Sequence, residues 1–213
     1  TPTQRGSACP WRDSPAKCSG KPETQKLTSM QNPYVSTFLG NRFFLTNPHI
    51  DDVAIEDIAH GLAYQCRFNG QTRSFYSVAQ HSLMVMSLVP ETLRFSALLH
   101  DAAEAYLGDM VKPLKNLFPE FSVIEARVME IIGHRFGLDL THLDPAIKQA
   151  DLIALATEKR DLMPHSVETW AYLHEIEPLS TTIQAMSPQE AKTAFLDAFN
   201  TCIRTHPSEQ GRT

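Results

Sequence analysis

The adjacent residues His100 and Asp101 interrupt a largely apolar stretch of the sequence at 95–99, and Glu104 follows close behind. On a helix these three ionisable side chains occupy neighbouring positions of one face. Burying such groups is costly unless something pairs with them, and a divalent metal ion is a suitable partner for an imidazole beside a carboxylate. A solvated polar edge is the alternative, but the alanines and leucines around the three residues are typical of a helix interior. The pattern therefore favours metal binding or catalysis.

Two further residues extend this set of possible metal ligands. His81 lies on a neighbouring predicted helix, and Asp151 places another carboxylate inside an apolar helical run at 147–155. A lone histidine such as His81 is more often a core residue with a satisfied hydrogen bond. Two histidines and two aspartates together predict a mononuclear site for one divalent transition metal, Mn, Co, Ni, Fe or Zn, with positions left for water and substrate. The four predicted ligands are His81, His100, Asp101 and Asp151.

Apolar residues spaced three and four apart predict the helices that position these side chains. Ser77, Asp144 with Pro145, and Ser187 are typical helix starts, and Gly108 is a typical helix stop. The predicted fold class is all-α, a bundle of about six main helices. These helices span residues 51–70, 77–89, 91–107, 121–136, 145–162 and 187–203, and only short stretches such as 43–45 or 74–76 could be strands.

The composition of the 213-residue chain limits which classes of protein it can belong to. An apolar content of 42% supports one globular domain, and a net charge of −5 with scattered lysines and arginines argues against a nucleic-acid or anionic-membrane partner. No run approaches the roughly 18 to 20 apolar residues of a membrane span, and the first residues lack the apolar core of a secretion signal. Four cysteines without CxxC spacing predict reduced thiols. We expect a cytoplasmic protein.

Three segments differ from the predicted domain at 30–206. Residues 1–29 contain four prolines and few aliphatic residues, which predicts a flexible leader, and 207–213 form a short tail. The connection 163–186 is longer than the roughly 12 to 15 residues usual in compact domains, and its aromatic residues argue against disorder. We expect this connection to form a lid or a wall of the site.

The order of the predicted ligands resembles the H…HD…D signature of the HD-domain superfamily of metal-dependent phosphohydrolases, over roughly residues 36–162. The segment 77–82, SVAQHS, resembles the motif of the first histidine, which more often has Glu where Gln80 stands. The segment 100–104, HDAAE, followed by Gly108-Asp109 and by 113–115, PLK, resembles the 5′-deoxynucleotidase branch and its triphosphohydrolase relatives in particular.

The resemblance implies that His81, His100, Asp101 and Asp151 ligate the metal. It also implies that Glu104 orients or deprotonates the attacking water. Arg67 and Phe68 match an Arg-aromatic pair that grips the phosphate and packs against the nucleoside, and Asp109 matches a residue that reads the sugar hydroxyl. Lys115 would add a cation for the phosphate.

The implied function is removal of the 5′-phosphate from deoxynucleoside monophosphates by metal-activated water. Two alternatives stay open: a deoxynucleoside triphosphate triphosphohydrolase that uses the same site, and a nucleotide-sensing module without turnover. The expected partner is a small nucleotide, and the apolar helix faces are compatible with a homodimer.

Four further residues affect how the site is interpreted. With Gln80 in place of Glu, a possible hydrogen-bond acceptor behind a metal ligand is lost, which would alter the metal preference. His134 and His142 fall where binuclear members of the superfamily carry extra ligands, and we expect both to be surface residues. Glu158 lies seven residues after Asp151, on the same helical face. We expect Glu158 to support a metal ligand or to pair with Lys159 or Arg160.

Overall fold

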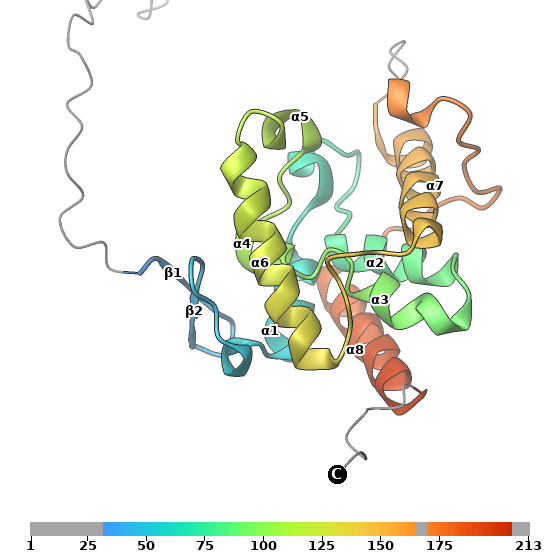
Figure 1. The fold of residues 1–213 in the computed structure, drawn as a ribbon. Helices are drawn as coiled ribbons and strands as arrows, with labels where there is room; N and C mark the ends of the chain where they lie inside the picture. The colour runs from blue at the N-terminus through green and yellow to red at the C-terminus, as the bar shows by residue number, and fades with distance from the viewer. Residues whose placement is uncertain (1–31, 165–169, 206–213) are drawn as a thin grey trace, which may run out of the picture. The chain divides into compact units, whose positions relative to one another are not determined.

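Helices dominate the part of the chain that a computed structural model describes, residues 32–164 and 170–205 (Figure 1). All of these residues belong to the unit Asn32–Thr213. The predicted leader and tail, and residues 165–169 of the long connection, lie outside the described residues. The prediction of an all-α fold is confirmed. The described α-helices are α1 (Ile55–Tyr64), α2 (Val78–Ser87), α3 (Arg94–Leu98), α4 (Glu104–Leu107), α5 (Lys112–Lys115), α6 (Pro119–Phe136), α7 (Pro145–Leu162) and α8 (Pro188–Thr205).

A small antiparallel sheet precedes the helices. It pairs β1 (Tyr34–Ser36) with β2 (Arg42–Phe44) and sets Val35 opposite Phe43. The strand predicted at 43–45 is therefore present, shifted by one residue toward the N-terminus, whereas 74–76 forms no strand. Short 3-10 helices join the longer elements: η1 (Ile50–Asp52), η2 (Arg67–Gly70), η3 (Glu91–Leu93) and η4 (Ala171–Leu173).

The helix starts use the predicted capping residues. Ser77 Oγ accepts the backbone N–H of Gln80 at 3.1 Å at the start of α2, and Asp144 Oδ1 accepts the N–H of Ala146 at 2.8 Å at the start of α7. At α8 the carboxylate of Glu190 accepts the N–H of Ser187 at 2.8 Å. Each bond satisfies a donor that the helix itself leaves unpaired. These short-range signals fix where α2, α7 and α8 begin.

The prediction of one continuous helix over 91–107 is wrong. Helix α3 ends at Leu98, α4 begins at Glu104, and the residues between them form turns with bonds between residues three apart, such as Glu104 N–H to Asp101 O at 3.0 Å. Neighbouring residues of a regular helix point about 100° apart. In a continuous helix Glu104 would neighbour both residues as expected, but His100 and Asp101 themselves would diverge. With the break at 99–103, the adjacent pair instead faces the same point. The predicted helix at 51–70 is likewise divided, into η1, α1 and η2.

Helix α8 packs against α1, α2 and α3, and α7 packs against α2 (Figure 1). Phe195 and Phe199 of α8 are buried with Ile58 and Leu62 of α1. Each such side chain contributes about 1.5–3 kcal/mol relative to an exposed position. A Cβ at Gly61 would lie 2.9 Å from the carbonyl oxygen of a residue in α4, so glycine permits α1 to approach the segment that carries Glu104. Among the described residues, no helix is long and apolar enough to cross a membrane.

Candidate metal centre

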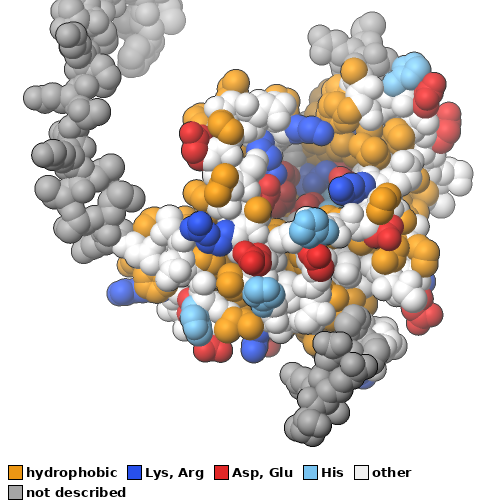
Figure 2. All heavy atoms as spheres, viewed as in Figure 1, with side chains coloured by type: hydrophobic (Ala, Val, Ile, Leu, Met, Phe, Trp, Pro, Cys, Tyr) orange, Lys and Arg blue, Asp and Glu red, His pale blue; other side chains and the backbone are white. Residues whose placement is uncertain are grey.

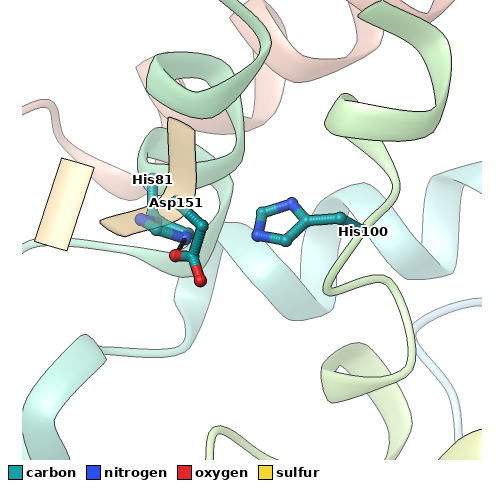
Figure 3. A group of neighbouring side chains, drawn as sticks. All are labelled: His81, His100 and Asp151. Carbon is teal, nitrogen blue, oxygen red and sulfur yellow. Dashed lines mark ion pairs between the residues drawn. The ribbon is translucent and has the colours of Figure 1, made fainter. Parts of the chain in front are cut away.

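Three of the predicted ligands converge from three different elements: His81 from α2, His100 from the turn after α3, and Asp151 from α7 (Figure 3). Each offers one ligand atom, and these atoms all lie within 4.8 Å of one another. Oδ2 of Asp101 lies 3.2 Å from His100 Nε2 and 3.5 Å from His81 Nε2. The fold therefore gathers all four residues that the sequence singled out, although they span 70 positions of the chain.

Hydrogen bonds orient both imidazoles toward this point. Nδ1 of His100 donates to the carbonyl oxygen of Ala97 at 2.8 Å, and Nδ1 of His81 lies 2.7 Å from Oε1 of Glu158. A carbonyl or carboxylate oxygen accepts a proton, so each Nδ1 carries the hydrogen and each Nε2 faces the centre. Among the described residues neither Nε2 atom makes a hydrogen bond of acceptable geometry, although Asp151 Oδ1 lies 3.2 Å from His81 Nε2 and Asp101 Oδ2 lies 3.2 Å from His100 Nε2. An unpaired buried polar atom costs about 1–3 kcal/mol, and a metal ion would remove that cost. The residues present thus fit a metal.

The electrostatics of the centre favour a bound cation. Burial and Arg67 act to lower the pKa of His81, but Glu158 and Asp151 outweigh them and raise that pKa to about 9. Burial alone would raise the pKa of Asp101, but the neighbouring His100 and His81 hold it below its usual range. The carboxylates that raise the pKa of His81 would also attract a metal ion, which competes with the proton for a histidine ligand.

Glu158 supports the centre from behind. Its side chain is fully buried, and Oε1 accepts a hydrogen bond from His81 Nδ1 at 2.7 Å. Oε2 accepts a hydrogen bond from Arg67 Nε at 3.1 Å and forms an ion pair with Arg67 Nη2 at 3.0 Å. These contacts are those expected of a residue that supports His81, the predicted metal ligand. The alternative pairing with Arg160 is wrong, because Arg160 Nε lies 2.6 Å from Asp161. The signal in the sequence was a carboxylate on the same helical face as Asp151.

Glu104 lies beside the predicted ligands with an unsatisfied carboxylate oxygen. The residue is 9% exposed, and Oε2 has no hydrogen-bond partner among the described residues. Burial raises the pKa of Glu104 well above its usual value, and the nearby carboxylates of Asp101 and Asp109 raise it further. A carboxylate with raised proton affinity is suited to accept a proton from water near pH 7.

A cavity of about 570 Å³, here called the main cavity, opens onto the centre. Figure 2 shows acidic and basic side chains inside a hollow of the surface. The residues for which the sequence predicted substrate contacts, Arg67, Phe68 and Asp109, all line the main cavity together with Glu104. It is also lined by Lys112 of α5, and by Trp170 and Tyr172 from the long connection. The predicted wall is therefore present in the described part of that connection.

The backbone at Phe68 and Asn69 is in the left-handed region, with φ of 54° and 51°. Residues other than glycine adopt this conformation at a cost of about 1–3 kcal/mol each, and such strain often marks functional sites. Hydrogen bonds on either side hold the turn: Arg67 N–H donates to Tyr76 O at 2.9 Å, and Gln71 N–H donates to Phe68 O at 3.0 Å. The turn presents Arg67 and Phe68 to one cavity.

Lys115 lies apart from the other predicted substrate residues. It lines a smaller cavity of about 240 Å³ with Glu125 and Thr141, and Asp101 and Glu104 form a wall common to both cavities. Nζ of Lys115 is 2.6 Å from Glu125 Oε1, so the lysine charge is already paired. Lys112, at the other end of α5, is the lysine that lines the main cavity.

Gln80 and the two additional histidines do not join the centre. Gln80 Nε2 donates to Gln184 O at 2.7 Å and its Oε1 accepts the N–H of Met186 at 2.9 Å, so the amide anchors the segment before α8. His134 and His142 are exposed, as predicted. Within the described residues, neither belongs to the group of converging ligand atoms.

Comparison with known proteins identifies relatives of this chain. No family model matches it. The chain is 39% identical over 168 residues to the uncharacterized protein YfdR of Escherichia coli K12, an alignment that covers 78% of the chain and 94% of YfdR. It is 34% identical over 193 residues to an uncharacterized protein of Rhodobacter capsulatus, covering 83% of the chain and 98% of that protein. The chain therefore belongs to the same family as YfdR.

Proposed function

We propose that this chain is an HD-type phosphohydrolase that removes the 5′-phosphate from deoxynucleoside monophosphates with one divalent transition metal. The observation that carries the proposal is the convergence of two buried histidine Nε2 atoms with Asp151, and with Asp101 close to both, beside Glu104 at the edge of the main cavity. A nucleotide-sensing module would need the cavity, but it has no use for a carboxylate base beside the metal.

His81, His100, Asp101 and Asp151 would hold the ion. When bound, it would polarise the phosphoryl oxygens and lower the pKa of a water molecule. Glu104 would accept a proton from the attacking water as the water oxygen forms a bond to phosphorus. The bond from phosphorus to the 5′-oxygen breaks, and that oxygen would take up the proton that Glu104 received, so that the nucleoside leaves with a free hydroxyl.

The remaining contacts of the substrate would come from the wall of the main cavity. Arg67 donates its Nε–H to Glu158 and contacts the same oxygen with Nη2, and a guanidinium has five N–H groups, so donors remain for the phosphate. The rings of Phe68, Trp170 and Tyr172 suit stacking against a base. Asp109 would accept a hydrogen bond from the sugar hydroxyl, as the resemblance implies.

The charges around the main cavity favour a monophosphate over a triphosphate. Among the described residues that line it, Arg67 and Lys112 are the basic ones. Glu158 already pairs with Arg67, while Asp101, Glu104 and Asp109 add negative charge. A triphosphate needs more cations within reach than a monophosphate does. We therefore prefer the nucleotidase over the triphosphohydrolase.

The test is phosphate release by metal-depleted protein resupplied with Mn²⁺, Co²⁺, Ni²⁺ or Mg²⁺. Substrates are deoxynucleoside monophosphates, ribonucleoside monophosphates and deoxynucleoside triphosphates. We expect inorganic phosphate from the deoxynucleoside monophosphates and no release without added metal. Triphosphate release from the triphosphates would favour the alternative hydrolase. Tight nucleotide binding without release of phosphate or triphosphate would support the nucleotide-sensing module instead.

A further inference from the structure

Glu158 is a buried charged residue that the proposed reaction does not use directly. None of its surface is exposed, and it lies on α7, two helical turns beyond Asp151. Both of its oxygens are engaged, Oε1 by a predicted metal ligand, His81, and Oε2 by the proposed phosphate-binding residue, Arg67. This single carboxylate is thus shared between the metal site and the anion site.

We propose that Glu158 couples these two sites, so that Arg67 influences metal affinity through the shared carboxylate. The inference makes Glu158 a positioning residue, and it rests on the metal centre of the proposed function but not on turnover. The sharing has a direct physical consequence, because one negative charge serves two donors. A stronger hydrogen bond to one oxygen leaves less charge on the other.

The effect on the metal follows from the bond to His81. A carboxylate behind a ligating histidine fixes its tautomer and raises its basicity as a ligand. Arg67 draws part of this charge away with one hydrogen bond from Nε and an ion-pair contact from Nη2. Removing the guanidinium would leave the full carboxylate charge facing His81, and the metal would bind more tightly.

The reverse effect acts on the phosphate. A metal ion on His81 Nε2 makes the Nδ1–H group a stronger donor, which draws carboxylate charge toward Oε1. The bonds from Arg67 to Oε2 then weaken, and the guanidinium is freer to bind an anion in the main cavity. Arg67 is only 8% exposed and His81 is fully buried, so little water screens the effect. Linkage requires the two effects to be equal in size.

A double-mutant cycle tests this coupling. The affinity of the full-length, metal-depleted chain for Mn²⁺ is measured by calorimetry, without nucleotide, for the wild type, Arg67→Met, Glu158→Gln and the double variant. Glu158→Gln should weaken Mn²⁺ binding about 10- to 100-fold, because the amide cannot accept from both partners. Arg67→Met should tighten binding about fivefold or more in the presence of Glu158 and much less in the Glu158→Gln background.

Arg160→Met is the matched control, since it removes another arginine that pairs with a carboxylate of α7, and it should leave Mn²⁺ affinity unchanged. Circular dichroism establishes which variants fold. Should Arg67→Met not fold, Arg67→Lys keeps a cation without the Nε–H bond and replaces it in the cycle.

An equal effect of the Arg67 substitution in both backgrounds would show simple charge repulsion and overturn the coupling. Failure of the wild type to bind a divalent metal would overturn both this inference and the proposed function. If the four Mn²⁺ affinities show the expected coupling but no nucleotide releases phosphate, the proposed hydrolase activity is wrong and the coupling stands.

Discussion

The two cavities beside the metal centre share Asp101 and Glu104 but differ in what surrounds them. The main cavity has aromatic rings and basic side chains, whereas in the smaller one the lysine is paired with Glu125. Lys112 and Lys115 are three residues apart on α5, yet they serve different cavities. Closeness to a predicted metal ligand is therefore not enough to mark a lysine as a proposed substrate contact. The two lysines differ in that Glu125 already pairs with Lys115.

Loss of a ligand at the centre that both cavities border should have the largest effect. His81→Ala removes a fully buried Nε2 from the converging group. Because a residue behind a ligand is worth 10- to 100-fold in metal affinity, we expect a loss of more than about 100-fold, with turnover at background. The metal content of the protein after dialysis measures the loss of metal binding. His142→Ala, which removes an exposed histidine, should bind metal like the wild type, and equal metal content in His81→Ala would contradict the ligand assignment.

Glu104, in the wall common to the two cavities, should matter for turnover but not for the metal. We expect Glu104→Gln to lower kcat about 10²- to 10⁴-fold while Mn²⁺ affinity stays close to that of the wild type. Burial and Asp101 raise the pKa of Glu104, and only the ionised form accepts a proton, so wild-type kcat should fall as the pH drops through that pKa. Steady-state kinetics across pH check both statements. Near-normal turnover by Glu104→Gln would rule out this base.

The aromatic wall distinguishes the main cavity and should act on substrate binding. Trp170 lies 6.1 Å from the ring of Phe68, measured between centroids. Contact between a base and an aromatic ring is worth about 1–3 kcal/mol, so Trp170→Ala should raise KM about tenfold with little change in kcat. Phe118→Ala, at an exposed position outside either cavity lining, serves as the control. An unchanged KM for Trp170→Ala would show that the nucleotide base does not stack against this wall.

The two lysines of α5 give the smallest and most specific contrast. Lys112 is exposed at the main cavity, where one charge contributes at most about 1 kcal/mol, so Lys112→Met should raise KM two- to fivefold, roughly. Lys115→Met should change KM less, because Glu125 already neutralises that lysine. Parallel kinetics on the two variants decide the matter. A larger increase in KM for Lys115→Met would show that the phosphate binds in the smaller cavity.

Local features of the sequence predicted much of this arrangement. The caps at Ser77 and Asp144 and the apolar spacing located α2 and α7, and ionisable residues inside apolar runs identified His100 and Asp151. Such signals depend on residues a few positions apart, so they can be read before the fold is known.

Features that depend on tertiary contacts could not be predicted in the same way. The break between α3 and α4 arises where His100 and Asp101 must face one point, and helix periodicity alone favoured a continuous helix. Glu158 contacts partners 77 and 91 residues away along the chain, so their identity depends on packing. The pairing of Lys115 at the smaller cavity likewise depends on Glu125 of α6.

The most direct test of the metal centre is a crystal structure of Glu104→Gln with Mn²⁺ and a deoxynucleoside monophosphate, with anomalous scattering to locate the metal. We expect one manganese ion between His81, His100 and Asp151, and the nucleoside in the main cavity against Phe68 and Trp170. An anomalous peak elsewhere, or a nucleoside in the smaller cavity, would contradict the account.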